Sequence, residues 1–147
     1  VSCSVASAGA DNTPQDDDTV VAVSAVPAPT IISYTTTVGT KTASYPGTAG
    51  GSSDAYFLDG TEAPEVTAAV GNEIIFYNED ASNSGHPIGI YDNEDKSGGE
   101  TSDGTITTTG TAGDGGTANV KWVPASAGTY WYQCKNHDLM GYKITVS

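Results

Sequence analysis

Three side chains that bind soft metal ions lie on one short segment near the C-terminus. Cys134, His137 and Met140 form the pattern Cys-x2-His-x2-Met within the closing sequence YWYQCKNHDLMGYKITVS. A thiolate, an imidazole and a thioether are donors that favour copper over magnesium or calcium. The chain has two histidines and a single methionine. The placement of one of each beside a cysteine therefore predicts a metal site.

The second histidine can supply the remaining donor. His86 lies in NSGHPIGIY, where a glycine-containing turn meets a predicted strand. A loop between two neighbouring strands can wrap one side of an ion, so a further donor must come from another strand pair, as His86 does. A cysteine, two histidines and a weak axial methionine form the ligand set of blue-copper sites. We predict one copper ion bound by His86, Cys134, His137 and Met140.

Other interpretations of these residues stay open. Cysteine and histidine also bind zinc, but structural zinc sites usually combine two paired clusters, whereas this chain has one cluster and an isolated histidine. Taken singly, Cys134 could be a small core residue and Met140 a core filler. The site could also leave its axial position open, with Met140 unbound. The coincidence of all four residues favours the copper site.

The elements that must hold these residues are predicted to be strands. Short runs of β-branched and aromatic residues are separated by Gly, Pro, Asn or Asp at intervals of about 8–12 residues, a spacing typical of an antiparallel sandwich. The predicted strands are residues 20–26, 30–38, 40–45, 55–60, 64–70, 72–78, 87–92, 104–109, 118–123, 128–134 and 142–147.

The last ligand-bearing strand shows the alternation of a half-buried strand. Within 128–134, Tyr132 and Cys134 fall on one face and Trp131 on the other, since successive side chains point to opposite faces. Residues 72–78 and 118–123 alternate in the same way. These patterns predict an all-β fold with the cysteine facing the core.

The chain divides into two regions by composition. Residues 1–29 are rich in Ser, Ala and Asp in their first part and are expected to form a flexible N-terminal leader. Residues 30–147 are expected to form one copper-binding domain, which is long enough to bury its own core. The polar run 92–116 is predicted to be a surface excursion that carries one weak strand.

Charge restricts the partners of the protein. The chain has 18 acidic residues, five lysines and no arginine, which gives a formal net charge of −13. Nucleic acid and anionic membranes would repel such a chain. No run of eighteen apolar residues is present, so no membrane span is expected. A basic partner is compatible with this charge.

The first residues favour an extracytoplasmic protein. The opening VSCSVASAGADN is similar to the remainder of a processed N-terminus. A secreted or periplasmic location is therefore expected. Cys3 could be an incidental free thiol, carry a lipid anchor, link a second molecule, or form a disulfide with Cys134.

The closing motif resembles that of the cupredoxins, the small type 1 blue copper proteins that include plastocyanins, amicyanins, pseudoazurins and halocyanins. The Cys-x2-His-x2-Met spacing is similar to the short amicyanin-type loop. The stretch FLDGTEAPEVTAAVGNEIIFYNEDASNSGHP is similar to the upstream half of the family, which ends at the first histidine ligand. The resemblance covers about residues 30–147.

The resemblance implies a Greek-key β-sandwich of seven or eight strands with copper near one end. It implies that His86, Cys134 and His137 are strong equatorial ligands and Met140 a weak axial one. It also implies a monomeric electron carrier that docks transiently with redox proteins through a surface near His137. Leu139, Met140 and Pro87 are the residues expected in that surface.

An enzyme is the alternative function. A single copper with an open axial position could act on a small molecule such as nitric oxide. Multicopper oxidases and copper nitrite reductases need further histidines, and the two in this chain are already assigned.

Pro87 departs from the cupredoxin pattern. The residue after the first histidine often donates its backbone N–H to the copper thiolate in this family, and proline has none. The sulfur of Cys134 should then leave more electron density on copper and lower the reduction potential, because hydrogen bonds around the sulfur tune it. The Asn136 N–H could supply the one remaining hydrogen bond.

Overall fold

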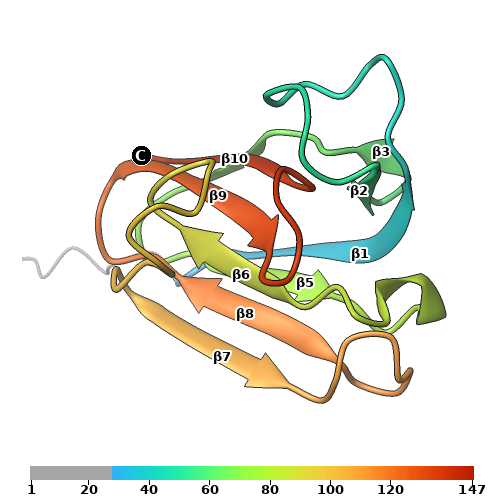
Figure 1. The fold of residues 1–147 in the computed structure, drawn as a ribbon. Helices are drawn as coiled ribbons and strands as arrows, with labels where there is room; N and C mark the ends of the chain where they lie inside the picture. The colour runs from blue at the N-terminus through green and yellow to red at the C-terminus, as the bar shows by residue number, and fades with distance from the viewer. Residues whose placement is uncertain (1–27) are drawn as a thin grey trace, which may run out of the picture.

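The chain folds as a two-layer β-sandwich in a computed structural model that describes residues 28–147 (Figure 1). These residues form ten strands and one 3-10 turn. Their bounds are β1 Ile31–Thr40, β2 Asp54–Leu58, β3 Thr61–Glu62, β4 Val66–Ala68, β5 Glu73–Tyr77, η1 Ala81–Asn83, β6 Ile88–Tyr91, β7 Thr105–Thr109, β8 Asn119–Val123, β9 Gly128–Cys134 and β10 Tyr142–Val146.

Two mixed sheets make up the layers. The six-stranded sheet has the order β3-β2-β1-β5-β8-β7, and the four-stranded sheet has the order β4-β10-β9-β6. Pairing is parallel between β1 and β5 and between β4 and β10, and antiparallel elsewhere. The chain passes between the two sheets five times, between β3 and β4, β4 and β5, β5 and β6, β6 and β7, and β8 and β9. The strands that border the predicted copper ligands, β6 and β9, pair with each other in the smaller sheet.

The core lies between the sheets and follows the predicted alternation. Trp122, Phe76 and Tyr132 are fully buried, whereas Tyr77 on the opposite face of β5 is 37% exposed. Cys134 belongs to the same buried cluster as Tyr132. The predicted orientation of the cysteine is thus confirmed.

The all-β sandwich predicted from the sequence is confirmed. Eight of the ten strands have four or more residues, and the other two, β3 and β4, are short pairings of two and three residues. The expectation of a strand over residues 40–45 is wrong, because β1 ends at Thr40 and the chain turns, with Tyr45 N–H bonded to the Thr42 carbonyl at 3.2 Å. Side chains with local acceptors stabilise this turn, as Ser44 N–H bonds to Thr42 Oγ1 at 3.1 Å.

Several expectations concern residues outside the described part of the chain. The predicted strand 20–26, the alternatives for Cys3 and nearly all of the predicted leader 1–29 lie there. The division into 1–29 and 30–147 stays a prediction. Within residues 28–147, no helix has the length and apolar character that crossing a bilayer requires.

Candidate metal centre

The pairing of β6 with β9 brings His86 and Cys134 together. The register sets Ile88 opposite Cys134, and Lys135 N–H donates to the Pro87 carbonyl at 2.9 Å. In an antiparallel pair, moving back by one residue on one strand means moving forward by one residue on its partner. His86, two residues before Ile88, therefore lies beside the first residues of the ligand loop, which we define as residues 135–140.

Hydrogen bonds fix the turn that carries His86. The His86 N–H donates to the Asn83 carbonyl at 2.8 Å, and the buried Asn83 amide donates to the Thr36 carbonyl of β1 at 2.7 Å. The Asn136 amide of the ligand loop donates to the Gly85 carbonyl at 2.9 Å. The turn is thus tied both to the larger sheet and to the loop that carries the other histidine.

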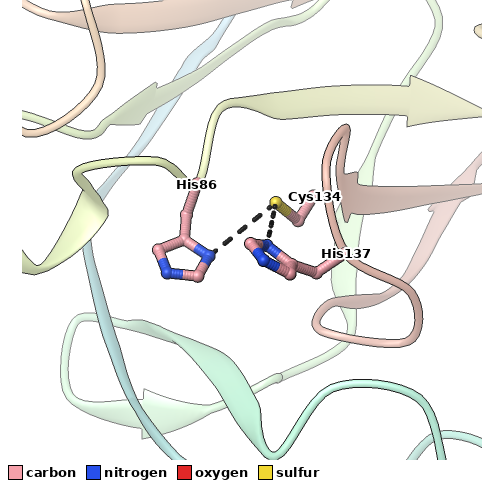
Figure 2. Close-up of side chains that lie close together, drawn as sticks. All are labelled: His86, Cys134 and His137. Carbon is pink, nitrogen blue, oxygen red and sulfur yellow. Dashed lines mark hydrogen bonds between the residues drawn. The ribbon is translucent and has the colours of Figure 1, made fainter.

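Three donor atoms converge on one point between these segments. His137 Nδ1 lies 3.5 Å and His86 Nδ1 3.9 Å from Cys134 Sγ, and Figure 2 shows both ring nitrogens directed at the sulfur. Metal–sulfur and metal–nitrogen bonds of about 2.3 and 2.0 Å at about 110–120° would set sulfur and nitrogen about 3.5–3.7 Å apart. The 3.5 Å separation to His137 falls within this range, and the 3.9 Å separation to His86 lies just above it.

This cluster is the one group of its kind among residues 28–147. Its three ligand atoms lie within 4.8 Å of one another, and the two imidazole rings have centroids 4.7 Å apart. One thiolate and two imidazoles form a donor set that can hold one copper ion. The structure therefore brings His86 together with Cys134 and His137, which lie 48 and 51 residues further along the chain.

The three side chains differ in their access to solvent. Cys134 is fully buried, His86 is half-buried and His137 is exposed. Burial lowers the pKa of His86, and the nearby His137 lowers it further, while Asp54 acts in the opposite direction. A lowered pKa keeps the His86 imidazole neutral near pH 7, and the neutral ring is the form that binds a metal ion.

Met140 is fully buried and belongs to the same core cluster as Cys134. Its backbone is held on both sides: its N–H donates to Gln133 Oε1 at 2.9 Å, and its carbonyl accepts from Tyr56 N–H at 2.8 Å. The expectation that Met140 forms part of an exposed docking surface is wrong, because the side chain turns into the core. Its role as an axial ligand stays a prediction.

Sequence reasoning did not identify several residues that position the site. The fully buried Gln133 accepts hydrogen bonds from Met140 and Gly141 through one oxygen, both at 2.9 Å. The hydroxyl of buried Tyr56 donates to the His86 carbonyl at 2.7 Å. Gln133 could have been noticed, because it is a polar residue directly before the predicted ligand Cys134. The sequence gives no signal for Tyr56, because it lies on β2, thirty residues before His86.

The sandwich and the cluster together fit the class of small cupredoxin-type copper proteins that the closing motif resembles. No family model matches the chain, and no curated protein sequence matches it. Solved structures of rusticyanin do match this chain. A rusticyanin mutant is 18% identical with a TM-score of 0.47, over 82% of this chain and 80% of its own.

Two further rusticyanin structures give similar values. One, a structure of the copper protein rusticyanin, is 17% identical with a TM-score of 0.46, over 82% of this chain and 80% of its own. Rusticyanin from Thiobacillus ferrooxidans is 16% identical with a TM-score of 0.44, over 82% and 79%. At these identities and TM-scores the likeness carries no argument about the metal or the function. The metal and the function of this chain are therefore judged from its own donor atoms.

Proposed function

We propose that the protein binds one copper ion through His86, Cys134 and His137, with Met140 as a weak fourth ligand, and carries single electrons between redox partners. The convergence of both Nδ1 atoms on the buried sulfur is the observation that supports this function. A bound copper ion would supply a one-electron Cu(II)/Cu(I) couple. The residues around it determine how easily and from where an electron arrives.

The scaffold would keep the donor positions nearly constant during electron transfer. Cys134 ends β9, and His86 immediately precedes Pro87 and β6, so paired strands anchor both ends of the site. The ligand loop is fixed by the hydrogen bonds of Gln133 and Asn136. Cu(I) and Cu(II) prefer different coordination geometries. A rigid scaffold that holds the ligands in an intermediate geometry therefore keeps the reorganisation energy of electron transfer small.

The exposed His137 gives the electron a route to the surface. Leu139, two residues after His137, and Pro87, directly after His86, are half-buried and would provide a small apolar rim suited to transient docking with a redox protein. The net charge of −13 would steer a basic partner toward the molecule, strongly at low salt and weakly at high salt. We further propose that the protein works as a monomer in a secreted or periplasmic location.

Copper reconstitution tests this function. We expect the purified protein to bind one equivalent of copper, to become intensely blue through its copper–thiolate bond, and to lose and regain the colour on chemical reduction and reoxidation. Electron paramagnetic resonance of the oxidised form should show a single copper environment. Rapid colour loss with a reduced redox protein would measure the proposed activity directly.

Other results would support other functions. A colourless protein that retains zinc after careful exposure to copper would contradict the electron-carrier proposal. A copper protein whose spectrum changes on addition of nitric oxide would indicate an open coordination position and favour the enzyme instead.

Pro87→Ala is expected to raise the reduction potential. The substitution introduces a backbone N–H at residue 87, which we expect to donate to the sulfur, and a hydrogen bond to the thiolate draws electron density from the copper and favours the reduced state. An added charge-assisted hydrogen bond should change the equilibrium constant about tenfold, which corresponds to about 59 mV for one electron. Spectroelectrochemical titration measures the shift.

Pro124→Ala is the matched control for Pro87→Ala. Pro124 follows β8 and precedes β9, so it lies at the end of β9 remote from Cys134, and its loss should leave the potential unchanged. Equal potentials for Pro87→Ala and the wild type would contradict the proposed effect of the missing donor.

A further inference from the structure

Lys96 directs its ammonium group at the backbone of the ligand loop. Its Nζ lies 3.0 Å from the Cys134 carbonyl and 3.1 Å from the His137 carbonyl, and 2.8 Å from the Asp138 carboxylate. A lysine ammonium has three N–H donors and no acceptor. All three can be used on the segment that carries two of the proposed ligands.

The backbone of Lys96 is strained in this position. Its φ is +61°, in the left-handed region that glycine and asparagine occupy readily and other residues rarely. Such a conformation is unfavourable in a non-glycine residue and persists only where the surrounding structure enforces it. The surrounding turn holds it, with Lys96 N–H on the Asn93 carbonyl at 3.0 Å and Gly99 N–H on the Lys96 carbonyl at 3.1 Å.

The five lysines of the chain fall into two groups. Three form ion pairs with glutamates at the surface, and their side chains are 33–38% exposed: Lys121 with Glu73, Lys135 with Glu100, and Lys143 with Glu65. Lys96 also forms an ion pair, with Asp138, but its own side chain is only 15% exposed. Lys41 also contacts the ligand loop, with its Nζ 2.7 Å from the Leu139 carbonyl. Two of five cations in a strongly acidic chain therefore hold this loop.

We infer that Lys96 is a positioning residue that fixes the ligand loop and, through its charge, raises the reduction potential of the site. This inference rests on the proposed function. The positive charge lies within hydrogen-bond distance of the carbonyls of Cys134 and His137, in a place largely shielded from solvent. Charges in such places are screened less by salt than exposed ones.

The direction of the effect follows from the charge balance of the redox step. One electron passes from an external reduced partner to the site, and the net charge of the site falls by one. A fixed positive charge nearby stabilises the more negative, reduced state relative to the oxidised one. Removal of this charge should therefore lower the potential, while the hydrogen-bonded loop geometry determines how firmly the ligands are held.

The test compares three variants of the full chain. Lys96→Gln removes the charge and leaves two N–H donors on a side chain that is one bond shorter, Lys96→Arg retains the charge and the donors, and Lys121→Gln removes the same charge from a surface ion pair on β8. We expect Lys96→Gln to decrease the equilibrium constant for reduction by about five- to tenfold, where tenfold equals 59 mV. Lys96→Arg should restore most of the wild-type value, and Lys121→Gln should leave it unchanged.

Salt and stability measurements exclude simpler explanations. The difference between wild type and Lys96→Gln should persist at about 1 M salt, where the Debye length is about 3 Å and exposed charges are screened. Thermal unfolding of the copper-free variants checks that each is folded. An unchanged potential in Lys96→Gln, or a decrease equal to that of Lys121→Gln, would overturn the assigned role of the charge.

A measurement on the copper-free protein separates this inference from the proposed function. Amide hydrogen exchange at Asn136, His137 and Asp138 should become faster in Lys96→Gln than in wild type, whereas Lys121→Gln should leave it unchanged. Unchanged exchange in Lys96→Gln would overturn the positioning role. Failure of the wild type to bind copper would instead contradict the proposed function, while the exchange result would still decide whether Lys96 fixes the loop.

Discussion

Cys134→Ser should abolish the blue colour and weaken copper binding more than about 100-fold, since changes outside the first ligand shell already cost about 10–100-fold in affinity. The sulfur is the atom on which both imidazole Nδ1 atoms converge. A serine hydroxyl is a hard, neutral donor and cannot replace a thiolate toward copper. Copper titration against a competing chelator, with absorption and electron paramagnetic resonance spectra, measures both effects.

The other cysteine provides the control for this substitution. Cys3→Ser makes the same chemical change at the other of the two cysteines, and we expect it to leave the colour and the copper affinity unchanged. Thermal unfolding of copper-free Cys134→Ser should show a folded protein, because the substitution removes little volume from the core. A blue Cys134→Ser protein, or a colourless Cys3→Ser protein, would contradict the assignment of the thiolate.

Gly141→Ala should destabilise the copper-free protein by about 2–3 kcal/mol, at the upper end of the cost of overfilling a packed region. A Cβ atom at Gly141 would lie 1.7 Å from the backbone carbonyl oxygen of Tyr132. The backbone at this position cannot shift freely, because its N–H bonds to Gln133 Oε1 at 2.9 Å and its carbonyl accepts from the Tyr45 hydroxyl at 2.6 Å. Urea unfolding monitored by tryptophan fluorescence measures the loss.

Gly128→Ala is the matched control on the same strand pair. The nearest atom to an added Cβ there is 3.3 Å away, in the side chain of Tyr130, which can move. We expect its free energy of unfolding to change by about 1 kcal/mol or less. The copper-loaded Gly141→Ala protein should also show an altered visible spectrum, since Met140 is the preceding residue. Equal stability of the two variants would disprove the tight approach of Gly141 to Tyr132.

Much of the strand arrangement could be predicted because alternation is a local property. Residues 72–78 were expected to alternate between two faces, and Ile74 and Phe76, which share one face of β5, are both fully buried. The failure over residues 40–45 has a local cause as well. The Thr42 N–H donates to the Glu62 carboxylate at 2.7 Å, so this backbone donor has a hydrogen-bond partner without a neighbouring strand. A pattern of β-branched and aromatic residues does not reveal such a side-chain acceptor.

The donor groups of the candidate site could be named from the sequence alone. Donor atoms are properties of residue types, and the spacing of Cys134, His137 and Met140 places them on one loop whatever the rest of the chain does. The lack of a backbone N–H at Pro87 likewise follows from the residue type alone.

The tertiary structure decided how the site is closed and held. The register of β6 against β9 brings His86 to Cys134 across 48 residues, and the burial of Met140 excludes it from the proposed docking surface. Lys96 reaches the His137 carbonyl across 41 residues. Contacts of this kind depend on strand register and on the path of loops through space. They result from the packing of the whole domain, which residue types and local spacing do not specify.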